Sequence, residues 1–191
     1  MRIIAGLAKG RLLKTLPGDT VRPTADRVRE SIFNILDSHI MGADILDLFA
    51  GSGALGLESL SRGAEASTFV EKSKRASLVI RENFETLHFQ NSQILTMDVF
   101  KSLSFFKRRE KFFDLVFADP PYSFFKEIWI QDLWKGVSQI LSKEGIFVVE
   151  HPSQWSSVKM MDSLEQYDIR QYGQTSVSFY KKGEIPSLPQ F

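Results

Sequence analysis

The stretch Asp44-Ile45-Leu46-Asp47-Leu48-Phe49-Ala50-Gly51-Ser52-Gly53-Ala54-Leu55-Gly56-Leu57 decides the fold of this chain. Its first half is an apolar run of the kind that a parallel sheet buries on both faces. Its second half has helical apolar spacing, and Gly51 and Gly53 lie between the two halves. A strand, a glycine turn and a helix N-terminus together form a site for a nucleotide-like ligand. The three glycines fit G-x-G-x-x-G, a pattern that by itself does not identify the ligand.

Strand and helix patterns alternate on the carboxyl side of this stretch. We predict strands over residues 66–71, 93–97, 113–118 and 145–150, and helices over residues 72–87, 99–109 and 124–141. Residues 168–172 and 175–180 are predicted to form an antiparallel hairpin around Gly173-Gln174. Strands separated by helices imply right-handed crossovers. The expected fold class is therefore α/β, a doubly wound Rossmann-like sheet that is mostly parallel and has a C-terminal antiparallel hairpin.

The residues before the glycine stretch are predicted to form a small appendage. Residues 2–5 and 11–14 look like two short strands around Lys9-Gly10. Thr24 is a natural N-cap for the amphipathic helix that follows. We therefore divide the chain into an N-terminal hairpin and helix (1–40), a main domain (41–182) and a loose tail (183–191).

The composition excludes several classes of protein. The 191 residues are 43% hydrophobic and 25% charged, which is ordinary for a soluble globular protein. There is no cysteine and only three dispersed histidines, so disulfides and zinc-thiolate sites are excluded and no metal is expected. No apolar run approaches the roughly 20 residues that span a bilayer, and the N-terminus lacks a signal-peptide core. The expected location is the cytoplasm, without a membrane partner.

The net charge of +1 hides a basic N-terminal arm. Residues 1–30 carry seven Lys and Arg against three Asp and Glu, a net charge of +4, so the other 161 residues sum to −3. Such an arm is suited to contacting phosphates, and it is equally compatible with a solvated, solubilising surface.

Acidic residues are expected to gather at one edge of the sheet. Asp47, Glu71, Asp98 and Asp119 lie at or near the ends of successive predicted strands. There, Glu71 would accept hydrogen bonds from ribose hydroxyls and Asp98 from an exocyclic amine. The spacing of Glu71 fits an NAD enzyme as well. Asp47 favours a ligand without phosphates, because a carboxylate beside the glycine turn repels a pyrophosphate and suits the ammonium or sulfonium side of S-adenosylmethionine.

The turn Asp119-Pro120-Pro121-Tyr122 is the most specific chemical signal. Two prolines fix the backbone, so the Asp119 side chain and the Pro120 carbonyl form two oriented acceptors. Two acceptors suit a planar –NH2 group and direct its lone pair at an electrophile. Tyr122 offers an aromatic face for a base, worth about 1–3 kcal/mol per base.

With the segment Leu46–Gly53, this turn resembles the class I S-adenosylmethionine-dependent amino-methyltransferases. The segments Arg2–Gly6, Gly10-Arg11 and Arg22–Asn34 narrow the resemblance to the RsmD family, which methylates the guanine N2 amine of bacterial 16S ribosomal RNA. The resemblance covers almost the whole chain and weakens after about Glu150. It implies S-adenosyl-L-methionine as cofactor and a partly assembled small ribosomal subunit as the RNA partner.

The resemblance and the strand-end pattern together give three sets of expected site residues. The catalytic set that holds the target base is Asp119, Pro120, Pro121 and Tyr122. The cofactor-binding set is Asp47, Phe49, Gly51, Ser52, Gly53, Glu71, Lys72, Asp98 and Val99. The RNA-binding set is Arg2, Lys9, Arg11, Arg22, Thr24, Arg27 and Arg29.

Three alternatives stay open at this point. The same turn serves amino-methyltransferases that act on DNA adenine or on a protein glutamine. The glycine pattern admits an NAD-dependent oxidoreductase. A catalytically silent RNA-binding assembly factor is a third reading, against which the presence of Asp119 and Tyr122 argues.

Overall fold

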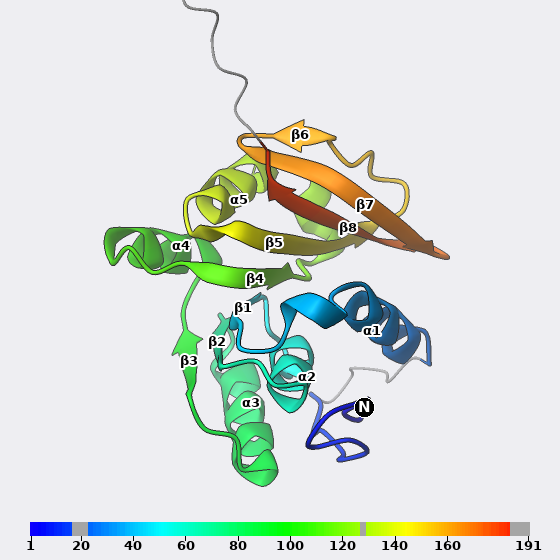
Figure 1. Cartoon of the computed structure of the whole chain (residues 1–191), viewed down its shortest axis with the longest axis vertical. Coiled ribbons are helices and arrows are strands. Elements are labelled where there is room, and N and C mark those ends of the chain that lie inside the picture. Colours follow the sequence, from blue (N-terminus) through cyan, green and yellow to red (C-terminus); the bar gives the residue numbers. More distant parts are fainter. Residues whose placement is uncertain (17–22, 127–128, 184–191) are drawn as a thin grey trace, which may run out of the picture.

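One eight-stranded sheet runs through the molecule (Figure 1). The computed structural model describes residues 1–16, 23–126 and 129–183. The strand order is β3-β2-β1-β4-β5-β8-β7-β6, with β1 to β5 parallel and β6 to β8 antiparallel. The strands are β1 (Asp44–Leu48), β2 (Ala66–Glu71), β3 (Ser92–Thr96), β4 (Phe113–Ala118), β5 (Leu141–Pro152), β6 (Met160–Met161), β7 (Leu164–Tyr172) and β8 (Thr175–Lys182). The predicted fold class is confirmed.

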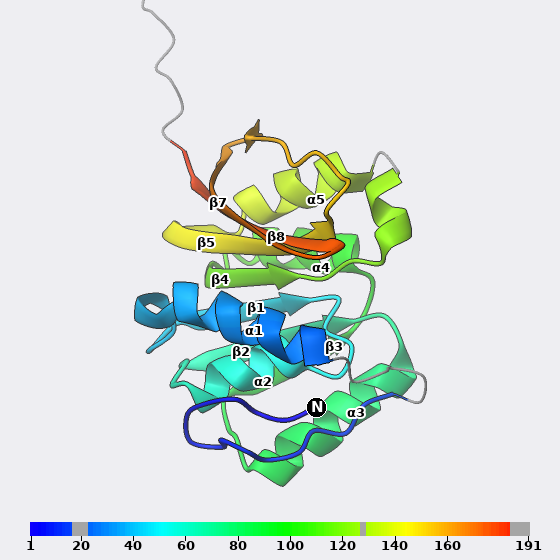
Figure 2. The same ribbon diagram turned by 90° about the vertical axis from the view of Figure 1, so that its right-hand side faces the viewer.

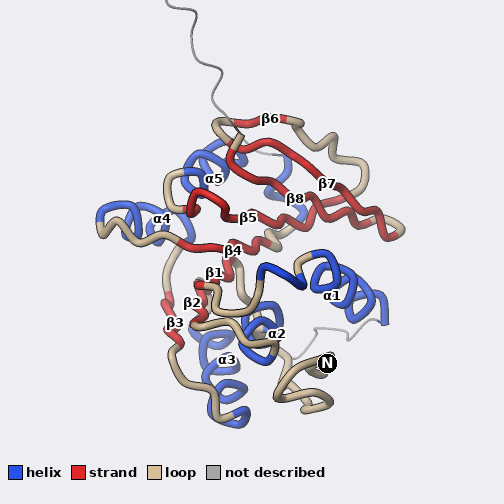
Figure 3. Tube along the Cα trace, viewed as in Figure 1, coloured by secondary structure: helices blue, strands red, loops and turns tan. Residues whose placement is uncertain are grey.

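Helices cover both faces of the sheet (Figure 3). The α-helices are α1 (Pro23–Ile35), α2 (Ala54–Ser61), α3 (Lys74–Leu87), α4 (Val99–Arg108) and α5 (Trp129–Ser138), and two short 3-10 helices are η1 (Asp37–His39) and η2 (Tyr122–Lys126). Helices α4 and α5 pack with Leu46, Val116 and Phe147 on one face. Helix α1 packs with Phe117 and Val148 on the other face, beside α2 and α3. No described helix is long and apolar enough to cross a membrane.

Strand register brings the predicted site residues to one edge. Leu48 of β1 is paired with Val70 of β2 and with Ala118 of β4. The carboxyl ends of β1, β2 and β4 are therefore neighbours in the sheet (Figure 2), with Glu71 as the last residue of β2 and Asp119 directly after β4. This is the edge at which open α/β sheets bind ligands.

The N-terminal segment, residues 1–16, is less regular than predicted. Its antiparallel pairing is limited to one bridge, between Arg2 and Leu12, with Ile3 N–H donating to the Arg11 carbonyl at 2.9 Å. The next two amides, of Ile4 and Ala5, leave this pairing and donate to the Glu58 carboxylate. A side chain of α2 thus takes the place of a second strand partner, and the predicted strands 2–5 and 11–14 do not form.

Several predicted boundaries are corrected. The helix predicted over residues 124–141 is divided into η2 and α5, and β5 begins at Leu141 instead of residue 145. Strand β6 was not predicted. Helix α1 already includes Pro23, so Thr24 lies in its first turn and not at the N-cap, while Arg22 lies outside the described residues. The predicted tail, 183–191, also lies outside them except for Gly183.

Candidate active site

A cavity of about 1110 Å³ opens at the carboxyl ends of the strands, against α4 and α5. Seven predicted site residues line it: Phe49, Glu71, Lys72, Asp98, Val99, Asp119 and Pro121. The structure thus brings the acids at the ends of the second and third strands and the Asp-Pro-Pro turn into one cavity. The lining also contains residues that the sequence reasoning missed, which are Phe100, Lys101, Leu103, Ser104, Lys107, Phe124, Trp129, Asp132, Lys135, Gly136 and Gln139.

The glycine turn forms the wall behind Glu71. Phe49, Gly51 and Gly53 have φ values of 59°, 55° and 80°, a region that is favourable only for glycine. Gly51 N–H donates to the Glu71 carboxylate at 2.9 Å, and Ser73 N–H donates to its other oxygen at 2.7 Å. These bonds fix the carboxylate at the cavity wall. Gly51, Ser52 and Gly53 shape this wall without lining the cavity themselves.

Asp98 has a structural task as well as a place in the cavity. It is the N-cap of α4, and its Oδ1 accepts from Phe100 N–H at 3.0 Å and Lys101 N–H at 3.4 Å. No described residue donates to Oδ2 of Asp98. The cap therefore holds the carboxyl at the cavity with one oxygen available to a ligand.

Asp47 lies under the glycine turn and does not line the cavity. It is 3% exposed, and its Oδ2 accepts from Gly56 N–H in the first turn of α2 at 3.0 Å. Burial, helped by the charges of Asp119 and Glu71 and opposed by the Gly56 hydrogen bond, raises the pKa of Asp47 to about 7. Its described contact is with the protein backbone, at the base of the turn.

Aromatic rings form much of the cavity wall. Phe124 lies edge-on to Phe49 at 5.5 Å between ring centroids and is stacked with Phe100 at 6.0 Å. Trp129 lies 5.9 Å from Phe100. The sequence reasoning missed Phe100, Phe124 and Trp129, although the phenylalanine-rich stretch after the Asp-Pro-Pro-Tyr turn was a usable signal.

The catalytic set is not gathered in one place. Asp119 and Pro121 line the cavity, whereas Pro120 is buried beside it. Tyr122 is 49% exposed, and its hydroxyl lies 2.8 Å from Thr175 Oγ1 at the start of β8. The Tyr122 ring therefore stands on the β8 side of the turn and is not part of the cavity wall.

Two carboxyl groups lie near the carboxyl ends of β4 and β5. Asp119 keeps part of its surface open to solvent along the cavity, while burial of its carboxyl raises its pKa to about 6. Burial and the negative charge of Asp119 raise the pKa of Glu150 to about 8. Of these two acids, sequence reasoning identified only Asp119. No group of three or more His, Asp or Glu in the described residues is arranged to hold a metal ion.

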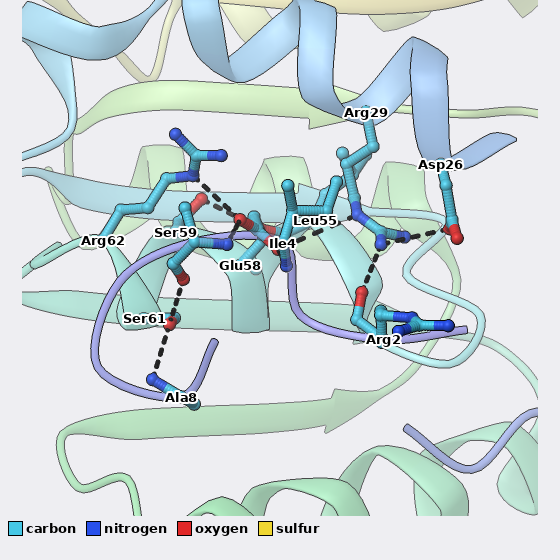
Figure 4. Close-up of polar contacts among 12 residues, drawn as sticks. Arg2, Ile4, Ala8, Asp26, Arg29, Leu55, Glu58, Ser59, Ser61 and Arg62 are labelled. Atoms are coloured by element: carbon cyan, nitrogen blue, oxygen red, sulfur yellow. Dashed lines mark hydrogen bonds and ion pairs between the residues drawn. The ribbon is translucent and has the colours of Figure 1, made fainter. Parts of the chain in front are cut away.

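A buried polar cluster joins the N-terminal segment to the main domain (Figure 4). Glu58 of α2 is 0% exposed and accepts from Ile4 N–H at 2.7 Å, Ala5 N–H at 3.0 Å and Arg62 Nε at 2.8 Å. Arg29 Nε lies 3.9 Å from the same carboxylate, and Arg29 also bonds to Asp26 and to the Arg2 carbonyl. Arg29 is only 4% exposed. Its predicted exposure to RNA is therefore wrong, and the residue holds the N-terminal segment in place.

Asn83 of α3 makes a second link between the N-terminal segment and the site. Its Oδ1 accepts from Lys14 N–H at 2.7 Å, and its Nδ2 donates to the Lys14 carbonyl at 2.9 Å. The same Nδ2 donates to the Ser52 carbonyl in the glycine turn at 3.1 Å. One buried amide therefore connects the basic segment to the wall of the cavity.

The remaining predicted RNA-binding residues that the structure describes are at the surface. Arg2, Lys9, Arg11 and Arg27 are exposed. Arg2, Lys9 and Arg27 line a second cavity, of about 310 Å³, together with Asp26 and Glu30. The side chain of Thr24 and all of Arg22 lie outside the described part of the chain.

Comparison with known proteins places this geometry in a family. The model of the family described as "Conserved hypothetical protein 95" matches residues 1–181. The chain is 38% identical over 185 residues, 95% of this chain and 99% of the relative, to "Putative rRNA methyltransferase YlbH" of Bacillus subtilis. It is 44% identical over 126 residues, 65% of each chain, to "Ribosomal RNA small subunit methyltransferase D" of Haemophilus influenzae.

A solved structure has the same fold as this chain. "Putative methyltransferase yhhF from Escherichia coli" superposes with a TM-score of 0.81 and 30% sequence identity, covering 96% of this chain and 98% of that one. The family match spans both the basic N-terminal segment and the sheet with its strand-end acids. The chain therefore belongs to the Conserved hypothetical protein 95 family, the RsmD family.

Proposed function

We propose that this protein transfers a methyl group from S-adenosyl-L-methionine to the exocyclic N2 amine of a guanine in 16S ribosomal RNA. The names of its relatives support rRNA as the substrate class. The observation that carries the proposal is that Asp119 and Pro121 line the same cavity as Glu71 and Asp98. The predicted cytoplasmic location is where a small ribosomal subunit would be met during its assembly.

The cavity fits the proposed cofactor. Ligand cavities commonly measure about 300–1,000 Å³, and this one, at about 1110 Å³, is slightly larger. Glu71 is fixed by two backbone amides and suits ribose hydroxyls, and the second oxygen of Asp98 suits an amine. Val99 and Phe100 offer an apolar surface for a planar ring. Asp47, with its high pKa, lies below the turn, where it disfavours a pyrophosphate once ionised.

The chain's own residues would act mainly by positioning the acceptor amine. Bound S-adenosyl-L-methionine supplies a methyl group that is already activated on a sulfonium. Enzymes that act on a base take it out of its stack, so we expect the guanine to enter this edge extruded from the RNA. Asp119 and the Pro120 carbonyl accept hydrogen bonds from the two amine N–H groups and direct the nitrogen lone pair at the methyl group. As the N–C bond forms, the S–C bond breaks to leave S-adenosylhomocysteine, and one N–H proton leaves after the transfer. Aligning the reacting atoms in this way accounts for most of the expected rate.

The alternatives predict different ligands. An NAD-dependent oxidoreductase requires pyrophosphate binding, and titration with S-adenosylhomocysteine and with NAD separates the two directly. Amino-methyltransferases on DNA adenine or protein glutamine share the Asp-Pro-Pro-Tyr turn. The exposed cations of the N-terminal segment favour nucleic acid over protein. A silent assembly factor would bind immature subunits without methylating them.

The first test is Asp119→Ala. We expect methylation of immature small subunits to fall by at least about 100-fold, as is typical when a group aligned on the reacting atoms is removed. S-adenosylhomocysteine affinity should stay within a few-fold, because Asp119 holds the base. Asp114→Ala, at the opposite end of β4, is the control and should keep its activity. A large loss of cofactor affinity in Asp119→Ala would contradict this division of roles, and mass mapping of the methylated nucleotide would test guanine N2.

A further inference from the structure

Glu150 is an acid at the active-site edge that the reaction proposed above does not use. It lies in β5, mostly buried, and no described residue forms a hydrogen bond or ion pair with its carboxylate. Carboxylates in such surroundings are costly unless they are paired. An acid without a partner among the described residues suggests a partner that arrives with the substrate.

Strand register places Glu150 beside Asp119. Ala118 of β4 is paired with Val149 of β5, so the next residues along the two parallel strands are Asp119 and Glu150. Adjacent strands lie about 4.8 Å apart, so this register brings the two carboxyl groups near each other, and the charge of Asp119 contributes to the raised pKa of Glu150.

Glu150 lies on the α1 side of the sheet, at the edge where Asp119 follows β4. Successive side chains alternate between the faces of a strand. Val148 packs on the α1 face and Val149 on the α4–α5 face, so Glu150 again belongs to the α1 face. Asp119 comes directly after β4 and lines the cavity, so the two acids are neighbours at the carboxyl edge of the sheet.

A hydrogen bond anchors the Asp-Pro-Pro-Tyr turn to the start of β8. The Tyr122 hydroxyl is bonded to Thr175 Oγ1, and Thr175 is paired with Pro152, two residues beyond Glu150. Tyr122 therefore connects the Asp-Pro-Pro turn to the carboxyl end of β5, two residues beyond Glu150, and to the start of β8.

We propose that Glu150 reads the Watson–Crick edge of the target guanine by accepting its N1–H, beside the N2 amine held by Asp119. This inference rests on the proposed function and extends it to base selection. Guanine presents two adjacent donors on this edge, N1–H and N2–H, and enzymes read an extruded base through this edge. Adenine has no N–H at N1, so only guanine gives the ionised Glu150 a donor next to the amine held by Asp119.

The raised pKa of Glu150 is consistent with this role. Without a donor the acid keeps its proton, because burial and the nearby Asp119 charge disfavour the ionised form. A bound N–H donor favours the ionised form. The site therefore turns into a pair of acceptors when a base with two donors is present.

The test compares Glu150→Gln with Glu150→Ala. Glutamine keeps an oxygen that accepts N1–H, and alanine does not. On immature small subunits we expect Glu150→Ala to lower kcat/KM by about 10–100-fold, the effect of losing a hydrogen bond to a charged group. Glu150→Gln should recover most of that loss, and both variants should bind S-adenosylhomocysteine like the wild type. Glu144→Ala, exposed near the other end of β5, should match the wild type throughout.

Three results would overturn the inference. Glu150→Ala with wild-type kcat/KM would show that the acid has no contact with the base. Equal losses in the Gln and Ala variants, or a parallel fall in S-adenosylhomocysteine affinity, would indicate a structural role only. A wild-type protein that binds S-adenosylhomocysteine and methylates no rRNA would overturn the proposed function, and this is read from the wild-type arm alone.

Discussion

At the scale of single residues, the unusual feature is a set of carboxyl groups with raised pKa values. Asp47, Asp119 and Glu150 lie at or near the carboxyl ends of β1, β4 and β5, and burial raises the pKa of each. Such shifts are common at functional sites, where dry surroundings and like charges are brought together. They also carry a cost in stability, because the unfolded chain ionises these groups freely.

That cost gives a prediction for Asp47→Asn. In the folded protein Asp47 has a pKa of about 7 against an ordinary 3.8, so between these values it holds a proton that the unfolded chain has released. The free energy of unfolding of the wild type therefore falls as pH rises through this window. Asparagine keeps an oxygen for Gly56 N–H and cannot ionise. Relative to the wild type, the variant should gain about 1–3 kcal/mol between pH 5 and pH 8, measured by urea denaturation. A pH-independent difference would contradict it.

At the scale of elements, the contact between the N-terminal segment and α2 is closely fitted around Gly6. Its φ is 80°, and a Cβ built there would lie 1.8 Å from the Ser61 carbonyl oxygen. Ser61 also accepts from Leu7 N–H at 2.7 Å through that oxygen and from Ala8 N–H at 2.9 Å through its hydroxyl. No side chain fits between the two backbones at this point.

Gly10 offers a matched control for Gly6. Its φ is 82°, yet a Cβ there would have nothing within 4 Å. In both alanine variants the left-handed backbone costs about 1–2 kcal/mol, and only Gly6→Ala adds a collision. We expect Gly6→Ala to lose clearly more unfolding free energy than Gly10→Ala in urea. It should also release the N-terminal segment to limited proteolysis, and equal behaviour of the two variants would refute the fitted contact.

The elements also show what sequence could and could not predict. The strands 66–71 and 113–118 were predicted with their observed bounds, because both are short stretches with β-branched or aromatic residues between longer helical patterns. The N-terminal strands were overpredicted, because their alternating pattern does not reveal that two amides bond to Glu58. A glutamate in a short helix normally faces solvent. The burial of Glu58 depends on three partners that are distant in the sequence.

Part of the candidate site could likewise be predicted from the sequence, and part could not. Strand-end acids could be predicted because parallel strands bring their carboxyl ends to one edge. The position of Tyr122 could not, since it depends on Thr175, 53 residues later in the chain. Glu150 was missed because one acid at the end of an apolar strand is ordinary in sequence. Only the pairing of β4 with β5 shows what lies beside it.

At the scale of the whole molecule, the proposed RNA surface and the cavity lie on connected parts of one body. Glu58 and Asn83 fasten the basic segment to α2 and α3, and Asn83 reaches the glycine turn. A phosphate contact on the segment would therefore place the RNA at a fixed distance from the cavity. Fixed placement of this kind is how remote contacts orient a reacting group.

A charge-removal experiment tests the surface. Lys9→Gln combined with Arg27→Gln should weaken binding to immature small subunits. The slope of log affinity against log salt concentration should become shallower by up to about 2, because each phosphate contact that is lost lowers the slope by close to one unit. Lys143→Gln combined with Lys181→Gln removes the same charge from β5 and β8 and serves as control. Equal slopes for the two double variants would place the RNA elsewhere.

Strand β8 comes last along the described chain and yet occupies an interior position, between β5 and β7. Strands β6 and β7 reach the rest of the sheet only through it. During synthesis, these two strands must therefore wait for the final one before they can join the sheet. A premature stop after Tyr172 would remove β8 and leave β6 and β7 without a connection to the sheet. The Asp-Pro-Pro-Tyr turn would then also lose its anchor at Thr175.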